Sequence, residues 1–329
     1  MKHILMLSTG GTIASKQTGH GLQPEIPGDD LVAEITELKN LCKITCRQIL
    51  NLDSSNIQPE DWMTMAQAVC DAQNDFDGIV ITHGTDTMAY SASALSFMLQ
   101  NLQIPVILTG SQLSIEEDGT DAKQNILDAF RTAITELCGI YIVFYGKIIR
   151  GTRAKKMFTK DFDAFHSINA EDIGQIKKDG TVIINELVRP KNVFSADICI
   201  DPNIFVLKLV PGTDPTLLDT VIDMGYHGII IEAFGCGGIP NQTRSLLPCL
   251  KKAKEHGVSI IIASQCTYET VDLTVYDVNV QAAKLGAISG LDMTIETLTT
   301  KLMWALGHTT DPQRIQEMMH TCYSGEFRE

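Results

Sequence analysis

Two threonines flanked by glycines are the residues of this chain whose type and spacing could do chemistry. Thr12 lies in the segment STGGTIAS (residues 8–15), and Thr85 lies in THGTDTM (residues 82–88). Each segment directly follows an apolar run that predicts a buried strand. Open α/β sheets place their active sites at the carboxyl ends of parallel strands. Two hydroxyls at such ends, one of them beside the carboxylate of Asp86, indicate covalent catalysis rather than binding alone.

Either threonine needs a neighbouring group to act as a nucleophile, because a hydroxyl is a weak nucleophile at neutral pH. A lysine can take the hydroxyl proton if burial or a nearby acid controls its own charge. The glycines at 10, 11 and 84 allow tight turns that bring backbone N–H groups close to a ligand, where they can hold a carboxylate or an oxyanion. One such segment alone would indicate a turn with a capping hydroxyl, but two at equivalent strand ends favour a catalytic site.

Other reactive side chains have simpler interpretations. His83 follows a strand, where a histidine is usually a satisfied structural residue. Cys42 and Cys46 lack a second pair at metal-binding spacing, which disfavours a zinc site. The nine cysteines are odd in number and are expected to be reduced thiols. The basic residues of segment 150–156, taken by themselves, predict a solvated loop.

Composition limits the class of protein and its partners. The chain has 329 residues, enough for two domains, with 44% hydrophobic and 20% charged residues, a profile typical of soluble globular proteins. A net charge of −14 repels phosphate backbones and disfavours a nucleic-acid partner. The apolar run near the N-terminus is too short for a signal peptide, and no run approaches the roughly 18 residues of a membrane helix. We therefore expect a cytoplasmic protein without a membrane partner.

Strand and helix patterns alternate along the first half of the chain. The expected strands are Ile4–Ser8, Ile44–Leu50, Gly78–Thr82, Pro105–Thr109 and Ile140–Phe144. The expected helices begin at Pro59, run from Asp86 to Leu102 and run from Asp121 to Leu137. Short, continuously apolar strands are typical of a parallel sheet with helices on both faces. The fold class is therefore α/β and doubly wound.

The composition changes at residues 189–203, where prolines and asparagines predict a connector. The alternation then resumes, with expected strands Phe205–Val210, Gly228–Ala233 and Val258–Ser264. The expected helices of this half begin at Asp214, end at Glu255, and run from Thr294 to Leu306 and from Asp311 to His320. We predict a larger N-terminal domain (1–188) carrying the threonines, a linker (189–203) and a smaller C-terminal α/β domain (204–329), both doubly wound with mainly parallel sheets.

Four segments together resemble the bacterial-type L-asparaginases, and more narrowly their cytoplasmic type I branch. They are TGGTIAS (9–15), ITHGTDTM (81–88), DSSN with PEDW (53–62), and RGTRAKK leading to FDAF (150–165). The segments TGSQ (109–112) and SQC (264–266) follow the same order and spacing. The resemblance extends along the whole chain, and a chance match to all four segments is not conceivable.

The resemblance implies an amidohydrolase that converts L-asparagine to L-aspartate and ammonia, with minor glutaminase activity. Thr12 looks like the nucleophile, while Thr85, Asp86 and Lys156 look like a second triad. In that triad, Lys156 would accept a proton from Thr85 and Asp86 would hold the lysine. The spacing back from FDAF favours Lys156 over Lys155.

The resemblance also implies a substrate grip and an assembly. Asp53, Ser54 and Ser55 would bind the α-carboxylate and α-amine, and Thr85 and Asp86 would also contact the substrate. No metal or organic cofactor is required. Members of the family assemble as homodimers, often paired into homotetramers, in which each site is completed by the C-terminal domain of a neighbour.

The chain departs from the family pattern at two places, and the role of a third position, Cys266, is left undecided by the sequence. A tyrosine is common in the loop after the first threonine, but Leu22 stands where it is expected, which puts the activation of Thr12 in doubt. Gly238 stands where relatives carry an amide, so discrimination between asparagine and glutamine could differ. Cys266 corresponds to a position linked with effector binding in some members, and a buried free thiol is the alternative.

Two other functions remain open from the sequence. The first is the ammonia-generating subunit of a tRNA-dependent amidotransferase, which shares both threonine signatures. Such subunits usually have an additional N-terminal domain, for which a first signature at Thr9 leaves no room. The second is an amino-acid sensor that has lost turnover; the missing tyrosine favours it, and the presence of Thr12, Thr85, Asp86 and Lys156 argues against it.

Overall fold

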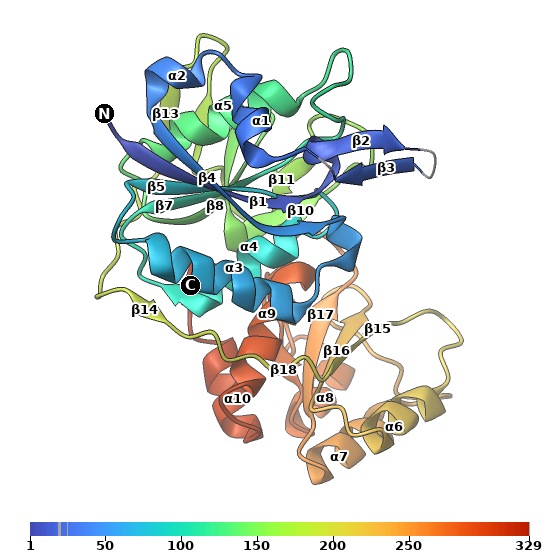
Figure 1. Ribbon diagram of the computed structural model, residues 1–329. Coiled ribbons are helices and arrows are strands. Elements are labelled where there is room, and N and C mark those ends of the chain that lie inside the picture. Colours follow the sequence, from blue (N-terminus) through green and yellow to red (C-terminus); the bar gives the residue numbers. More distant parts are fainter. Residues whose placement is uncertain (19–20, 25, 329) are drawn as a thin grey trace. The chain divides into compact units, whose positions relative to one another are not determined.

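The computed structural model describes residues 1–18, 21–24 and 26–328, and the chain divides into two compact units, Met1–Ile198 and Cys199–Glu329 (Figure 1). Both units are α/β and mainly parallel, as predicted. The division falls inside the segment 189–203 that the sequence predicts as a connector. Among the described residues, no helix has the length and apolar character needed to cross a membrane.

The N-terminal unit is built on an eight-stranded sheet of order β13-β12-β9-β8-β7-β5-β1-β4. Five neighbouring strands are parallel, and β9, β12 and β13 add an antiparallel edge. The five strands predicted for this half are the five parallel ones. Their bounds, and those of the antiparallel edge, are β1 (His3–Gly10), β4 (Lys43–Leu52), β5 (Gly78–Thr82), β7 (Pro105–Thr109), β8 (Gly139–Phe144), β9 (Lys147–Arg150), β12 (Gly174–Ile176) and β13 (Val182–Ile184).

Burial along the strands follows their position in the sheet. Every residue of β5 and β7 is buried, as expected for central strands covered on both faces. Strand β4 differs from this expectation, because it lies at the edge of the sheet and none of its residues is fully buried. Its only neighbour in the described sheet is β1, so its other edge has no strand beside it.

Helices cover both faces of this sheet, and their bounds are α1 (Gly28–Ala33), α2 (Leu38–Leu41), α3 (Pro59–Ala72), α4 (Met88–Met98) and α5 (Ala122–Ala133). Helix α3 begins at Pro59, and the Asp61 carboxylate accepts a hydrogen bond of 2.8 Å from the backbone N–H of Gln58. The proline and the acidic side chain in the first turn therefore both help to start the helix. Helices α4 and α5 are shorter than predicted. Helix α4 ends at Met98 because Leu99–Gln100 form strand β6, which pairs with β14 (Ser195–Ala196).

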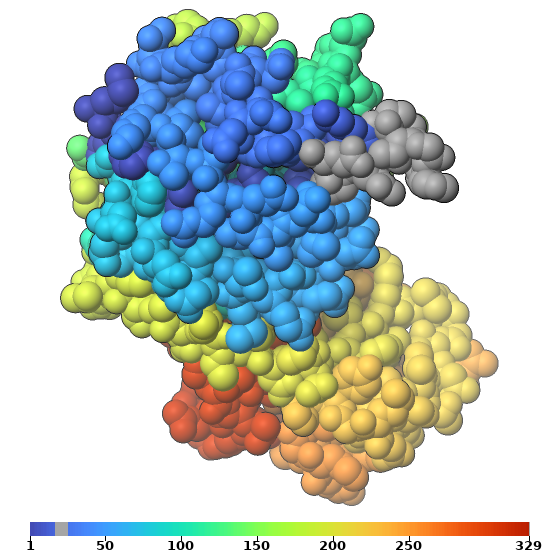
Figure 2. All heavy atoms as spheres, in the orientation of Figure 1, coloured from blue at the N-terminus to red at the C-terminus, as the bar shows by residue number. Residues whose placement is uncertain are grey.

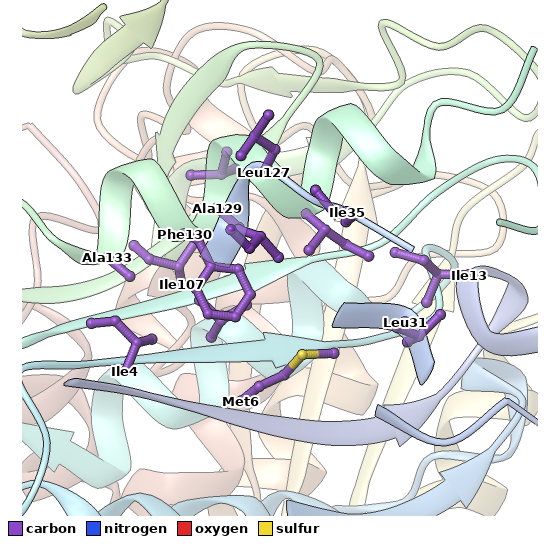
Figure 3. Close-up of a cluster of buried hydrophobic side chains, with 14 of the residues drawn as sticks. Ile4, Met6, Ile13, Leu31, Ile35, Ile107, Leu127, Ala129, Phe130 and Ala133 are labelled. Atoms are coloured by element: carbon purple, nitrogen blue, oxygen red, sulfur yellow. The ribbon is translucent and has the colours of Figure 1, made fainter. Parts of the chain in front are cut away.

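Apolar side chains between α5 and the sheet form the main core of the unit (Figure 3). Ile4 and Met6 of β1 and Ile107 of β7 point to this face, where they meet Phe130 of α5. All four side chains are fully buried. This packing fixes the strands from one side, so that their carboxyl ends are held in register.

Short elements that the sequence did not predict surround these carboxyl ends. They are the hairpin β2 (Ser15–Thr18) with β3 (Gly21–Pro24), the ribbon β10 (Ala154–Lys156) with β11 (Phe165–Ser167), and the 3-10 turns η1 (Thr12–Ala14), η2 (Ser54–Asn56) and η3 (Gly151–Arg153). A loop around Glu116, green in Figure 2, projects from the surface. It is tied to the start of β2 by the ion pair Lys16–Glu116 at 3.5 Å and by a hydrogen bond from the Ser114 hydroxyl to the carbonyl of Ser15.

The C-terminal unit is a second doubly wound layer structure with a four-stranded parallel sheet of order β15-β16-β17-β18. Alternate residues of β16 enter different cores: Ile229 and Ile231 pack with α6 and α7, whereas Ile230 packs with α9 and α10. Its elements are β15 (Ile204–Lys208), α6 (Pro215–Asp223), β16 (Gly228–Ala233), α7 (Leu247–Glu255), β17 (Ser259–Ser264), α8 (Asp277–Lys284), β18 (Ile288–Ser289), α9 (Ile295–Leu306) and α10 (Pro312–Met319).

Candidate active site

The two glycine–threonine segments meet at the carboxyl edge of the large sheet. Strands β1 and β5 are adjacent and parallel, and Ser8 pairs with Thr82, so both chains leave the sheet at the same level. A Cβ atom at Gly11 would lie 2.4 Å from the backbone nitrogen of Gly84. The residues that directly precede the two threonines are therefore in backbone contact, which only glycine permits.

Lys156 reaches the second threonine from the β10–β11 ribbon. Its Nζ lies 2.7 Å from Thr85 Oγ1 and 2.7 Å from Asp86 Oδ1, and it donates a hydrogen bond to each. In the ribbon, Lys156 pairs with Phe165 and Lys155 pairs with His166. Successive residues of a strand face opposite sides, so the ribbon that turns Lys156 toward Thr85 turns Lys155 to its other face.

The three side chains of this cluster differ in their exposure. Thr85 is 6% exposed, and the side chain of Lys156 is 16% exposed against 65% for Asp86. An ion pair with one partner in water adds little to stability. The Lys156–Asp86 pair is therefore expected to contribute little to the stability of the fold.

The predicted substrate loop lies against the same cluster. Turn η2 begins after β4, and Asp53 accepts hydrogen bonds from the backbone N–H of Ser55 at 2.8 Å and from its hydroxyl at 2.5 Å. Ser54 is buried, and its hydroxyl accepts a hydrogen bond of 3.2 Å from the backbone N–H of Asp86. Asp53 and Ser55 are exposed, whereas Ser54 joins this turn to the Thr85 loop.

The first threonine lies at the start of turn η1. Thr12 is half-buried, and its loop is closed by a hydrogen bond of 2.9 Å from the Ser15 hydroxyl to the carbonyl of Gly11. The side chain of Leu22, which stands where a tyrosine was expected, lies outside the described residues.

His83 has the structural role that the sequence indicated. It is fully buried, and its two ring nitrogens lie within hydrogen-bond distance of the Gly84 carbonyl and the Ser91 hydroxyl. Sequence reasoning did not single out Ser91, because a serine in the middle of an apolar helix carries no spacing signal.

Two of the simpler interpretations are wrong. Segment 150–156 is not a solvated loop: it forms β9, η3 and β10, and Arg153 is only 2% exposed. Cys266 is exposed, so it is not a buried thiol. All nine cysteines are free, and the described residues contain no group of three or more His, Cys, Asp or Glu side chains that could hold a metal ion.

Comparisons with known proteins place the chain in a family. The model of the asparaginase N-terminal domain matches residues 3–189, and that of the glutaminase/asparaginase C-terminal domain matches residues 203–319. An L-asparaginase from Thermococcus kodakarensis is 44% identical over 98% of both chains. A subunit of the glutamyl-tRNA(Gln) amidotransferase from the same organism is 37% identical, over 98% of this chain and 76% of that protein. The solved structure of the thermostable L-asparaginase from T. kodakarensis matches with a TM-score of 0.94 at 42% identity, covering 99% of both chains. The chain belongs to the asparaginase family.

Proposed function

We propose that the protein hydrolyses L-asparagine to L-aspartate and ammonia, with minor activity on glutamine. The observation that carries this proposal is the position of Lys156 Nζ, 2.7 Å from both the Thr85 hydroxyl and the Asp86 carboxylate, in a chain of the asparaginase family. A hydroxyl, an amine and an acid in hydrogen-bond contact form a unit that can take up and return protons during a hydrolytic reaction.

In the proposed reaction, the Thr12 hydroxyl oxygen attacks the side-chain amide carbon of the substrate and forms a tetrahedral intermediate. Backbone N–H groups of the glycine-rich loops stabilise its oxyanion. As the C–N bond breaks, the proton released by the Thr12 hydroxyl is delivered to the leaving nitrogen, and ammonia leaves. Water then hydrolyses the threonine ester, which releases aspartate and restores the hydroxyl.

The Lys156–Thr85 pair moves protons in this scheme. A charged Lys156 donates to Thr85 Oγ1, whereas the neutral amine, at the same distance, accepts the hydroxyl proton. Asp86 orients the amine and is exposed enough to meet the α-ammonium of the substrate. No cofactor takes part in the proposed steps.

The η2 turn is proposed to bind the α-ammonium and α-carboxylate groups of the substrate. We propose that Asp53 and Ser55, which are exposed, contact the α-ammonium and α-carboxylate. The Ser54 hydroxyl accepts from the N–H of Asp86 and keeps its own proton to donate to the carboxylate. A carboxylate and a hydroxyl donor together match a small zwitterion.

The test is ammonia release from L-asparagine by the purified chain alone. We expect stoichiometric aspartate and ammonia, and a lower kcat/KM for L-glutamine. Turnover that appears only when an amidotransferase partner and charged tRNA are added would favour the amidotransferase function instead, which the 37% identical relative supports. Binding of asparagine without ammonia release would favour a sensor.

We also propose a cytoplasmic homodimer or homotetramer. The nine free cysteines support the compartment, because disulfides form in oxidising ones. Light scattering on the purified chain measures the assembly, and a monomer that is fully active would contradict it.

Replacing Gly11 by alanine should disable the site by separating the two loops. Its φ of +81° strains any side chain, and the new Cβ would lie 2.4 Å from the Gly84 nitrogen. We expect kcat to fall by about 100-fold, since a displacement of about 1 Å can cost that much. Gly225→Ala is the matched control, because Gly225 has a φ of +84° and nothing within 4 Å of its Cβ position. Equal kcat values for the two variants would show that contact between the loops is not required.

A further inference from the structure

A chain of three buried side chains ends on the loop that carries Thr85. The indole Nε1 of Trp62 on α3 lies 3.0 Å from the Ser91 hydroxyl on α4, which lies 2.9 Å from Nε2 of His83. Nδ1 of His83 lies 2.7 Å from the carbonyl oxygen of Gly84. Trp62 is 5% exposed, and His83 and Ser91 are fully buried. Helices α3 and α4 thus reach the catalytic loop through hydrogen bonds as well as through packing.

The direction of each hydrogen bond in this chain is determined by its ends. A carbonyl oxygen can only accept, so Nδ1 of His83 carries the proton and donates to Gly84. Burial lowers the pKa of His83 to about 4, so the ring is neutral at physiological pH and Nε2 accepts. Ser91 must then donate to Nε2 and accept from the indole N–H, which can only donate. One proton arrangement satisfies all three groups.

This arrangement fixes the peptide group between Gly84 and Thr85. The C=O and N–H of a trans peptide point in opposite directions. With the Gly84 oxygen held against the buried imidazole, the N–H of Thr85 is directed away from it. The same peptide sets the position of the Thr85 side chain, whose Oγ1 must stay 2.7 Å from Lys156 Nζ. The backbone of His83 is itself anchored by its N–H, which donates to the Thr109 carbonyl at 2.8 Å.

We propose that His83 is a positioning residue for the hydrolytic reaction, held in its Nδ1–H form by Ser91 and Trp62. It acts through the Gly84–Thr85 peptide and does not touch the substrate. This inference rests on the proposed function, because it assigns the histidine to the same site. The three hydrogen-bonded side chains hold the Thr85–Lys156 pair in one orientation and add no charged group to the site.

An isosteric pair of variants separates the hydrogen bond from the packing. His83→Asn keeps an N–H near the position of Nδ1, whereas His83→Leu has nearly the same volume and no donor. We expect kcat to fall by about 100-fold in the leucine variant and by about tenfold or less in the asparagine variant, the range for small misplacements of reacting groups. KM should change little in either variant, because the lost interaction positions the reacting groups without contacting the substrate. Equal kcat values in two folded variants would overturn the proposal.

A second pair tests the link to helix α4. Ser91→Ala removes the donor to His83, and Ser96→Ala removes another buried hydroxyl of α4, which donates to the Ala92 carbonyl at 2.7 Å within the helix. We expect only Ser91→Ala to lower kcat, while both lower the melting temperature modestly. A kcat loss that follows the melting temperature in both variants would overturn the assignment.

The tautomer gives a readout that is independent of activity. Nitrogen NMR of the histidine ring in the intact protein should show a proton on Nδ1 and a bare Nε2, with no titration until the pH falls to about 4. A proton on Nε2 at neutral pH would overturn the proposed directions of the hydrogen bonds among Trp62, Ser91 and His83. If the unmodified protein releases no ammonia from asparagine but shows the Nδ1–H tautomer, the proposed function fails while the hydrogen-bonded chain stands.

Discussion

Replacement of Thr85 by valine, or of Thr12 by alanine, is expected to lower kcat by about 10⁴-fold or more, the scale on which loss of a nucleophile or its activating partner acts in covalent hydrolases. Thr85 is 6% exposed, so the isosteric valine fills its space and removes only the hydroxyl that contacts Lys156. Thr12 is half-buried in a short turn, so alanine removes the oxygen that is proposed to attack the substrate, with little loss of packing. Steady-state ammonia release measures both effects.

The controls for these variants concern the fold and the distinction between the two roles. Circular dichroism and melting temperature should match those of the unmodified protein, since neither hydroxyl supports the core. The double variant should be no worse than the poorer single variant, because residues that act as one unit are not additive. Near-full activity in either single variant would remove that threonine from the mechanism.

Lys156→Met is expected to lower kcat by about 10³-fold, within the range for loss of a general acid–base group. The unbranched methionine has a similar shape but cannot exchange a proton with Thr85 or hold Asp86. The unpaired Asp86 carboxylate is 65% exposed and stays hydrated, so the free energy of unfolding should hardly change.

The adjacent lysine provides the matched control. Lys155 belongs to the same strand and has the same chemistry, but it pairs with His166 on the other face of the ribbon. Lys155→Met should therefore keep most of the kcat of the unmodified protein. Equal losses in the two variants, or a larger loss for Lys155→Met, would reassign the base.

Much of the fold was predictable because its signals are local. The central strands of the N-terminal unit are runs of apolar residues that end in glycine or threonine, and the boundaries of β5 and β7 match the prediction at both ends. The same signals located the loops that carry Thr12 and Thr85. Parallel strands must place those loops on one edge, so their proximity followed from the fold class.

The errors arose where a distant partner decides the conformation. Helix α4 was predicted to reach Leu102 but ends at Met98, because Leu99–Gln100 pair with Ser195–Ala196 almost a hundred residues later. The charges of segment 150–156, taken by themselves, indicated a solvated loop, and only the resemblance to a family singled out Lys156 within it. Its strands are three or four residues long, too short for a periodic pattern, and they exist because β8 and β11 lie beside them.

By itself, the sequence determined the α/β class, the main parallel strands and the longer helices, and the two loops in which a reactive hydroxyl follows glycine, because hydrophobic periodicity and glycine content are properties of neighbouring residues. Only the tertiary structure showed that Lys156, which the spacing already favoured, lies 2.7 Å from the Thr85 hydroxyl, that Ser54 accepts a hydrogen bond from Asp86 and that His83 contacts the Gly84 carbonyl. The first two contacts join elements far apart in the chain, and the third joins neighbouring residues inside a buried cluster that also includes Ser91 of α4 and Trp62 of α3. Their geometry depends on strand register and on which face of a strand or helix is buried, and these properties exist only once the layers have packed.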